Sequence, residues 1–163
     1  NHVQVPEGGH TGSAPRAELD DAVLGSLRAR YGRVATERVN AGPGITEIYR
    51  AMGGSVLPDD RTIWQKGIAR EDELASRAVD RFCGSLGSVV GDYALAHGAS
   101  AVVLAGGLGL RLRDILPTST FAERFCAKPR YEAMMAGIPV KLIVHPQPGL
   151  YGAAAAFQTE HCR

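Results

Sequence analysis

The sequence predicts an α/β domain in which parallel strands are flanked by helices. Its 163 residues, 45% of them hydrophobic, are enough for one globular domain with a buried core. In the second half of the chain, segments with helical periodicity alternate with short strand-like segments. Strands that are joined by helical crossovers lie parallel in one sheet, so a layered α/β architecture follows.

The N-terminal segment is expected to contain a strand, a turn and a helix. Val3 and Val5 alternate with polar residues, which predicts a short strand running into a glycine turn. A helix is expected over 17–31, because acidic residues open it and arginines close it, the order that suits the helix dipole. The stretch 34–44 then shows short alternation that gives way to two glycines around Pro43.

Three further helices are predicted before the first strand of the second half. One covers "ITEIYRAM" and is closed by Gly53 and Gly54, and one covers 59–70 and is opened by "PDD". The longest runs over 71–97 with an apolar stripe at helical spacing.

Three glycines fall three and four residues apart on this long helix, at Gly84, Gly87 and Gly91. Each glycine inside a helix costs about 1 kcal/mol relative to alanine. Their spacing therefore predicts that another element packs against the helix backbone there.

The remaining segments complete the predicted sheet. A buried strand is expected over 101–105, followed by a glycine turn and a helical segment. After "FAERFCAK", a second strand is expected over 138–145. The chain closes with "PGLYGAAAAF", a helix of small residues that the face of a sheet could receive at close range.

Charge and cysteine content exclude several classes of protein. With 18 basic and 17 acidic side chains, the net charge is +1, and no electrostatic footprint for nucleic acid or a membrane surface stands out. We therefore expect a neutral small molecule or a balanced partner. Cys83, Cys126 and Cys162 form no CxxC pair, so free thiols in the cytoplasm are expected. There is no run of apolar residues long enough to span a bilayer, and the first residue is Asn1, as in a piece of a longer protein.

One candidate binding site lies at Gly106 and Gly107, directly after the first predicted strand. In open α/β sheets the carboxyl ends of the strands form the ligand crevice, and glycines there let a phosphate approach the backbone. The segment has neither the Lys-Ser/Thr of a P-loop nor the full dinucleotide fingerprint. Nucleotide binding and a tight strand-to-helix turn both remain open from the residues alone.

A second candidate site lies at "PEGGH", where Glu7 and His10 flank two glycines. The pair could serve as metal ligands, as an acid/base pair for hydrolysis, as hydrogen-bonding groups for a polyhydroxyl ligand, or as a polar loop that caps the next helix. A metal site needs further ligands, and none cluster nearby in sequence. Glu37 has the same open status, either buried and paired or solvated.

Four co-linear segments together resemble bacterial ATP-dependent glucokinases of the hexokinase-like superfamily: "VPEGGH", "ATERVNAGPGITEIYRA", "VVLAGGLGLRL" and "PVKLIVHPQPGLYGAAAAF". The resemblance implies a ribonuclease-H-like (actin/hexokinase-type) large domain. It assigns glucose binding to Glu7, His10 and Glu37, with the family's spacing of 27 residues between the last two. It assigns the ATP-facing strand end to Gly106 and Gly107. Cleft-shaping roles fall to a further set of glycines: Gly8, Gly9, Gly42 and Gly44.

The departures from this family pattern are as informative as the match. The phosphate-binding Asp-x-Gly-Gly-Thr hairpin, the Asn-Asp pair that carries the catalytic base, and a second glycine-rich turn are all missing from the sequence. Residues 1–163 are therefore expected to be the C-terminal large-domain part of a glucokinase, with no catalytic residue or magnesium ligand of its own, and inactive alone. Implied partners are glucose, ATP with Mg²⁺, the missing N-terminal half and a second copy in a homodimer. A sugar-binding regulator that has lost catalysis on the same scaffold and a metal-dependent hydrolase using His10 are the alternatives.

Overall fold

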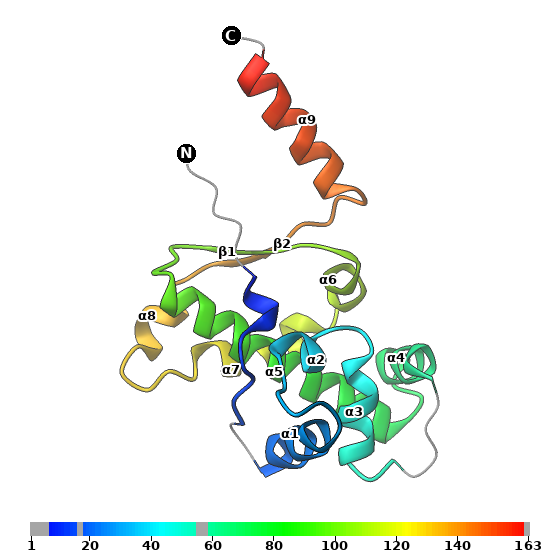
Figure 1. Cartoon of the computed structure of the whole chain (residues 1–163). Helices are drawn as coiled ribbons and strands as arrows, with labels where there is room; N and C mark the ends of the chain where they lie inside the picture. The colour runs from blue at the N-terminus through cyan, green and yellow to red at the C-terminus, as the bar shows by residue number, and fades with distance from the viewer. Residues whose placement is uncertain (1–6, 16–17, 55–58, 162–163) are drawn as a thin grey trace.

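The computed structural model describes residues 7–15, 18–54 and 59–161, which form a body of helices beside a small parallel sheet (Figure 1). The strand expected at Val3 and Val5, and Cys162, lie outside these residues. The elements follow one another in the order η1 (Gly8–His10), α1 (Glu18–Tyr31), α2 (Thr36–Asn40), α3 (Gly44–Ala51), α4 (Asp60–Ala69), α5 (Glu73–Ala96), β1 (Val102–Leu104), α6 (Gly107–Leu112), η2 (Leu116–Thr118), α7 (Phe121–Cys126), α8 (Glu132–Ala136), β2 (Val140–Leu142) and α9 (Pro148–His161).

The long helix α5 organises the helical body. It begins after Asp72, whose carboxylate accepts a hydrogen bond from the Ala75 amide at 2.7 Å and caps the first turn. α5 packs against α2, α3, α4 and α7, and its apolar stripe is buried in the shared core. Trp64 of α4 meets Phe82 of α5 edge to face at 4.9 Å between ring centroids. The predicted helices over 17–31, 45–52, 59–70 and 71–97 are thus confirmed as α1, α3, α4 and α5.

The glycine stripe of α5 is confirmed as a packing surface. A Cβ atom added at Gly87 would lie 2.2 Å from the Phe121 carbonyl oxygen, and one at Gly91 would lie 2.5 Å from the Phe125 carbonyl oxygen. At Gly84 the nearest atom of α7's N-terminal turn would be 2.7 Å away. These distances are too short for any side chain, so the glycines let α7 lie directly on the backbone of α5.

The sheet consists of two parallel strands within the described residues, as predicted, with Val102 opposite Val140 and Leu104 opposite Leu142. The prediction that 101–105 is a buried strand is wrong, because Val103 is 58% exposed. The body covers one face only, so inward and outward side chains alternate. The second strand is also shorter than the predicted 138–145.

Two other segments add to what the sequence pattern indicates. The short alternation from residue 34 runs into the helix α2, Thr36–Asn40, on which Val39 is buried against the core. The helix α9 forms, but among the described residues no sheet face receives it. Residues 149–159 are exposed, and α9 projects beyond the sheet, away from the body (Figure 1).

The described cysteines behave as ordinary thiols. Cys83 is buried and Cys126 is partly buried, and both are free, as expected. Burial raises the pKa of the Cys83 thiol to about 11, so it stays protonated near neutral pH.

Candidate functional site

Residues 7–10 of the "PEGGH" segment form a single turn of 3₁₀ helix, η1, over Gly8–His10 with Glu7 at its start. The His10 amide donates to the Glu7 carbonyl oxygen at 3.1 Å, and the Thr11 amide donates to the Gly8 carbonyl oxygen at 3.0 Å. Residues three apart eclipse one another in a 3₁₀ turn, so Glu7 and His10 lie on the same side. Gly9 brings this turn against α2, where an added Cβ would lie 3.5 Å from the Glu37 Cβ.

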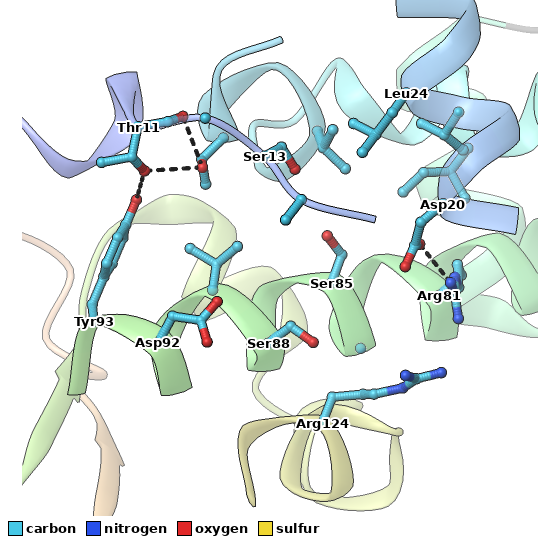
Figure 2. A pocket seen from close by; sticks show the side chains of 18 residues that line it. Thr11, Ser13, Asp20, Leu24, Arg81, Ser85, Ser88, Asp92, Tyr93 and Arg124 are labelled. Atoms are coloured by element: carbon cyan, nitrogen blue, oxygen red, sulfur yellow. Dashed lines mark hydrogen bonds and ion pairs between the residues drawn. The ribbon is translucent and has the colours of Figure 1, made fainter. Parts of the chain in front are cut away.

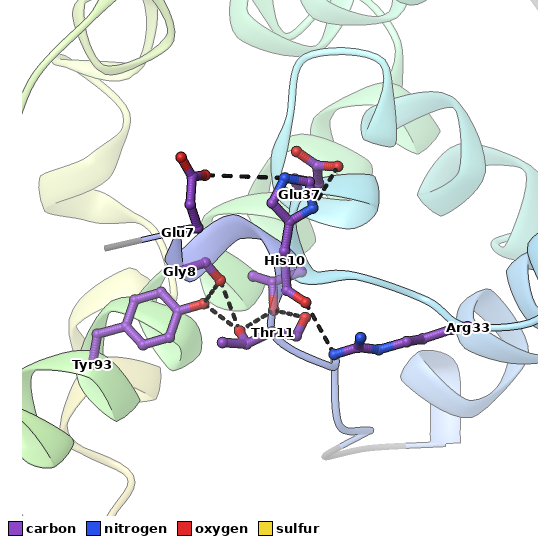
Figure 3. Close-up of polar contacts among 8 residues, drawn as sticks. Glu7, Gly8, His10, Thr11, Arg33, Glu37 and Tyr93 are labelled. Carbon is purple, nitrogen blue, oxygen red and sulfur yellow. Dashed lines mark hydrogen bonds and ion pairs between the residues drawn. The ribbon is translucent and has the colours of Figure 1, made fainter. Parts of the chain in front are cut away.

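The turn brings together the three polar residues that the sequence singles out, here called the Glu7–His10–Glu37 cluster (Figure 3). The His10 Nδ1 lies 3.6 Å from the Glu37 Oε1, and the His10 Nε2 lies 4.0 Å from the Glu7 Oε2. Both distances are longer than a hydrogen bond, so the imidazole lies between two carboxylates without being hydrogen-bonded to either of them. The side chains of Glu7, His10 and Glu37 are 81%, 65% and 48% exposed, which answers the open question for Glu37: it is half-exposed and adjacent to His10.

A set of hydroxyl groups, here called the hydroxyl unit (Thr11, Thr36 and Tyr93), holds the cluster from behind. The Tyr93 hydroxyl, on α5, donates to the Gly8 carbonyl oxygen and lies 2.5 Å from the Thr11 Oγ1. The Thr11 Oγ1 lies 3.2 Å from the Thr36 Oγ1, and the Thr36 amide donates to the Thr11 carbonyl oxygen at 2.8 Å. The unit therefore ties η1 to α2, which carries Glu37, and anchors both on α5.

Backbone contacts extend this attachment along the chain. The Ser13 amide donates to the Val34 carbonyl oxygen at 3.0 Å, and Gly12 forms an antiparallel bridge with Ala35. The Arg33 guanidinium donates to the His10 carbonyl oxygen at 3.0 Å (Figure 3). Residues before and after α1 are thus paired side by side.

The "AGPG" turn fixes the end of α2. A Cβ at Gly44 would lie 2.1 Å from the Val39 carbonyl oxygen, so only glycine allows α3 to start this close to α2. The indole nitrogen of Trp64 donates to the Gly42 carbonyl oxygen at 2.9 Å. Gly42 and Gly44 therefore hold the helix that presents Glu37 in place.

The second candidate site, Gly106 and Gly107, lies elsewhere, between the carboxyl end of β1 and the start of α6 (Figure 1). Gly106 has φ 103°, a conformation that L side chains rarely adopt, and it caps α6. Open space surrounds Gly107, where an added Cβ would meet nothing within 4 Å. The tight strand-to-helix turn is therefore present. In the described residues no hydrogen bond joins it to the Glu7–His10–Glu37 cluster.

Sequence reasoning found the cluster but missed the hydroxyl unit behind it. Tyr93 is 82 residues from Thr11, and a tyrosine in an amphipathic helix looks like any core residue. The described residues gather no group of three or more His, Cys, Asp or Glu that could hold a metal ion. In the same part of the chain, no helix combines the length and hydrophobicity needed to span a membrane.

Comparison with known proteins decides the family. The family model described as Glucokinase matches residues 1–160. The chain belongs to the glucokinase family. The resemblance carried by the four co-linear segments is thus confirmed.

Individual glucokinases match over nearly the whole chain. The glucokinase of Zymomonas mobilis is 49% identical over 160 residues, which cover 95% of this chain and 49% of that protein. The glucokinases of Xylella fastidiosa and Xanthomonas campestris are each 39% identical over 91% of this chain and 46% of theirs. The crystal structure of a glucokinase from an Antarctic psychrotroph superposes with a TM-score of 0.84 at 34% identity, covering 94% of this chain and 50% of that one. The chain thus spans about half the length of the glucokinases it matches.

Proposed function

We propose that the complete protein containing this chain is an ATP-dependent glucokinase that phosphorylates the 6-hydroxyl of glucose. The observation that carries the proposal is the meeting of Glu7, His10 and Glu37 on one solvent-facing surface in a chain of the glucokinase family, although 27 residues of sequence separate His10 from Glu37. Two carboxylates accept hydrogen bonds and an imidazole can donate or accept one, which suits a ligand made of hydroxyl groups.

The proposed role of the cluster is to bind and orient the sugar. Phosphoryl transfer depends mainly on positioning and on stabilisation of charge, so a residue that fixes the attacking hydroxyl contributes without taking part in bond making. Glu7 and Glu37 would accept hydrogen bonds from sugar hydroxyls, while His10 lies between them. Gly8 and Gly9 allow the turn to approach α5 and α2 closely enough to build this surface.

For ATP, we propose the turn at Gly106 and Gly107. Its backbone is exposed at the carboxyl end of a parallel strand, where α/β proteins bind nucleotides. Mg²⁺ is held through one or two carboxylates and the substrate phosphates, and the described residues offer no gathered carboxylates near this turn. We therefore assign the magnesium ligands and the catalytic base to the half of the relatives that this chain does not match.

We further propose that this chain is the C-terminal part of a ribonuclease-H-like large domain acting in the cytoplasm. The exposed face of the sheet at Val103 and the exposed side chains of α9, Leu150, Tyr151 and Phe157, would then contact the rest of the protein. Without that half, the same surfaces favour association of two copies.

The test is production of glucose 6-phosphate by the complete protein from glucose and ATP, with a Glu37→Gln variant. Removing the charge while keeping the shape should raise KM for glucose by about tenfold to a hundredfold, because hydrogen bonds to charged groups are the stronger ones. Glu71→Gln, an exposed carboxylate outside the cluster, is the matched control and should behave as wild type.

Two results would contradict the proposal. If the complete protein made no glucose 6-phosphate, the proposed kinase activity would be excluded. If it bound glucose without phosphorylating it, the non-catalytic regulator would be favoured. If the Glu37→Gln variant kept the wild-type KM for glucose, Glu37 would not be part of the sugar site.

A further inference from the structure

A cavity of about 170 Å³ lies behind the hydroxyl unit, between the segment 11–14, α1, α5 and α7 (Figure 2). One ordered water needs only about 10–15 Å³, so the cavity has room for a small molecule. Thr11, Thr36 and Tyr93 all line it, whereas the residues of the Glu7–His10–Glu37 cluster do not. The hydroxyl unit therefore separates the cavity from the proposed sugar surface and contacts both.

Two arginines from different helices reach the same end of this cavity. Arg81 of α5 pairs through one guanidinium nitrogen with the Asp20 carboxylate at 2.5 Å, while its Nε is buried without a hydrogen-bond partner in the described residues. Arg124 of α7 passes over the backbone of α5, with its Cγ 3.4 Å from where a Cβ of Gly84 would be. Figure 2 shows both guanidinium groups extending toward the Asp20 side of the cavity.

The cavity has more hydrogen-bond donors than its own carboxylates require. Asp20 is paired with Arg81, and Asp92 is paired with Lys128 at 3.0 Å, so each acidic side chain on the wall faces a cation. The Arg124 guanidinium makes no hydrogen bond or ion pair with the described residues, and only its backbone amide is bonded, to the Thr120 carbonyl oxygen at 3.0 Å. Hydroxyl groups on the wall add further donors: Ser13, Ser85 and Ser88. Guanidinium forks beside hydroxyls are the groups that bind oxyanions.

We propose that this cavity binds a small phosphate-bearing anion, either inorganic phosphate or a phosphomonoester, between Arg81 and Arg124. The Ser85 hydroxyl would donate to a phosphate oxygen. Because Thr11 and Tyr93 form the opposite wall and hold the Gly8 carbonyl, an occupied cavity changes the position of η1 and therefore the affinity of the sugar surface. This regulatory half of the proposal rests on the proposed function, whereas the binding half does not.

The experiment measures anion binding to the complete protein by calorimetry, with inorganic phosphate and glycerol 3-phosphate as separate probes. Each titration is repeated with a saturating non-hydrolysable ATP analogue, so that phosphate bound at a nucleotide site is displaced. We expect saturable binding that survives the analogue and weakens at least about tenfold in Arg124→Gln. Arg113→Gln, which removes an arginine exposed away from the cavity, should bind as wild type.

A second variant guards against a folding defect in the first. Ser85→Leu fills the cavity without changing its charge and should also abolish binding, while circular dichroism checks that each variant is folded. Stronger binding of glycerol 3-phosphate than of phosphate identifies a phosphomonoester as the ligand, and the reverse order identifies free phosphate. No saturable binding, or equal binding by Arg124→Gln and wild type, overturns the site.

The coupling is tested by titrating glucose with and without the saturating anion. An apparent glucose affinity that changes by about fivefold or more supports the regulatory role. If the anion binds but the glucose affinity does not change, the regulatory role is contradicted, while the proposal of an anion-binding site stands. A protein that binds the anion but no glucose contradicts the proposed function alone.

Discussion

The helical body and the edge formed by β1, β2 and α9 differ in how much of their apolar surface this chain covers. In the body, Trp64 and Phe82 are 1% and 0% exposed, whereas at the edge Leu150 and Tyr151 are 68% and 70% exposed. Apolar surface of that kind is seldom left open in a monomer. The residues of this chain bury the core of the body, whereas at the edge they leave apolar side chains exposed, and we propose that the rest of the protein covers them. The cluster, carried by η1 and α2, belongs to the body.

The largest effect is expected from a substitution that separates α7 from α5, because it tests whether contacts within this chain stabilise the helical body. Gly87→Ala places a Cβ 2.2 Å from the Phe121 carbonyl oxygen, and backbone cannot yield as a side chain can. We expect the free energy of unfolding in urea to fall by about 3 kcal/mol, despite the better helix propensity of alanine. Gly25→Ala, on an open face of α1, is the control and should gain up to about 1 kcal/mol. Equal stability of the two variants would show that α7 does not rest on α5.

The edge is tested by making α9 polar. In the isolated 163-residue chain, Tyr151→Ser with Phe157→Ser should reduce self-association measured by light scattering, because these rings are 70% and 60% exposed. In the complete protein the same pair should lower the stability by about 2 kcal/mol, because we propose that the rest of the protein buries these rings. Gln158→Ser, an exposed polar position on α9, should change neither measurement. A pair that leaves the complete protein unaffected would show that α9 is exposed there too.

The smallest effect is expected from a substitution in the hydroxyl unit, which tests whether α5 holds the Glu7–His10–Glu37 cluster in position. Tyr93→Phe keeps the ring beneath Gly8 but removes the hydroxyl that contacts Gly8 and Thr11. Losing these hydrogen bonds should weaken glucose binding by about 1 kcal/mol, because the turn is held less firmly in place. KM for glucose should then rise by about fivefold, while kcat changes less. Tyr131→Phe, at a half-exposed tyrosine away from the cluster, is the control. A fall in kcat with an unchanged KM would contradict a positioning role for Tyr93.

Local pattern was enough to predict most of the helical body. The helices α1, α3, α4 and α5 have apolar side chains at helical spacing within their own sequence, and Asp59 and Asp72 cap α4 and α5. The glycine spacing on α5 indicates a neighbour that lies 30 or more residues away in the sequence. The helix α2 was missed because five residues are too few to show a period of 3.6.

The parts that sequence did not predict depend on contacts between distant segments. Val103 and α9 are exposed because no other described segment of this chain packs over them. The periodicity of a segment does not indicate whether another segment covers it. For the site, family resemblance selected Glu7, His10 and Glu37, and the fold brings them together. The hydroxyl unit has no local signal, since each of its contacts joins different elements.

The hydroxyl unit also has a consequence for synthesis on the ribosome. Thr11 and Tyr93 are 82 residues apart, so the turn at "PEGGH" emerges well before the helix that anchors it. Contacts of such long range form late, after the intervening helices have collapsed. The turn at residues 7–10 is thus among the first parts of this chain to be translated and among the last to take its final shape.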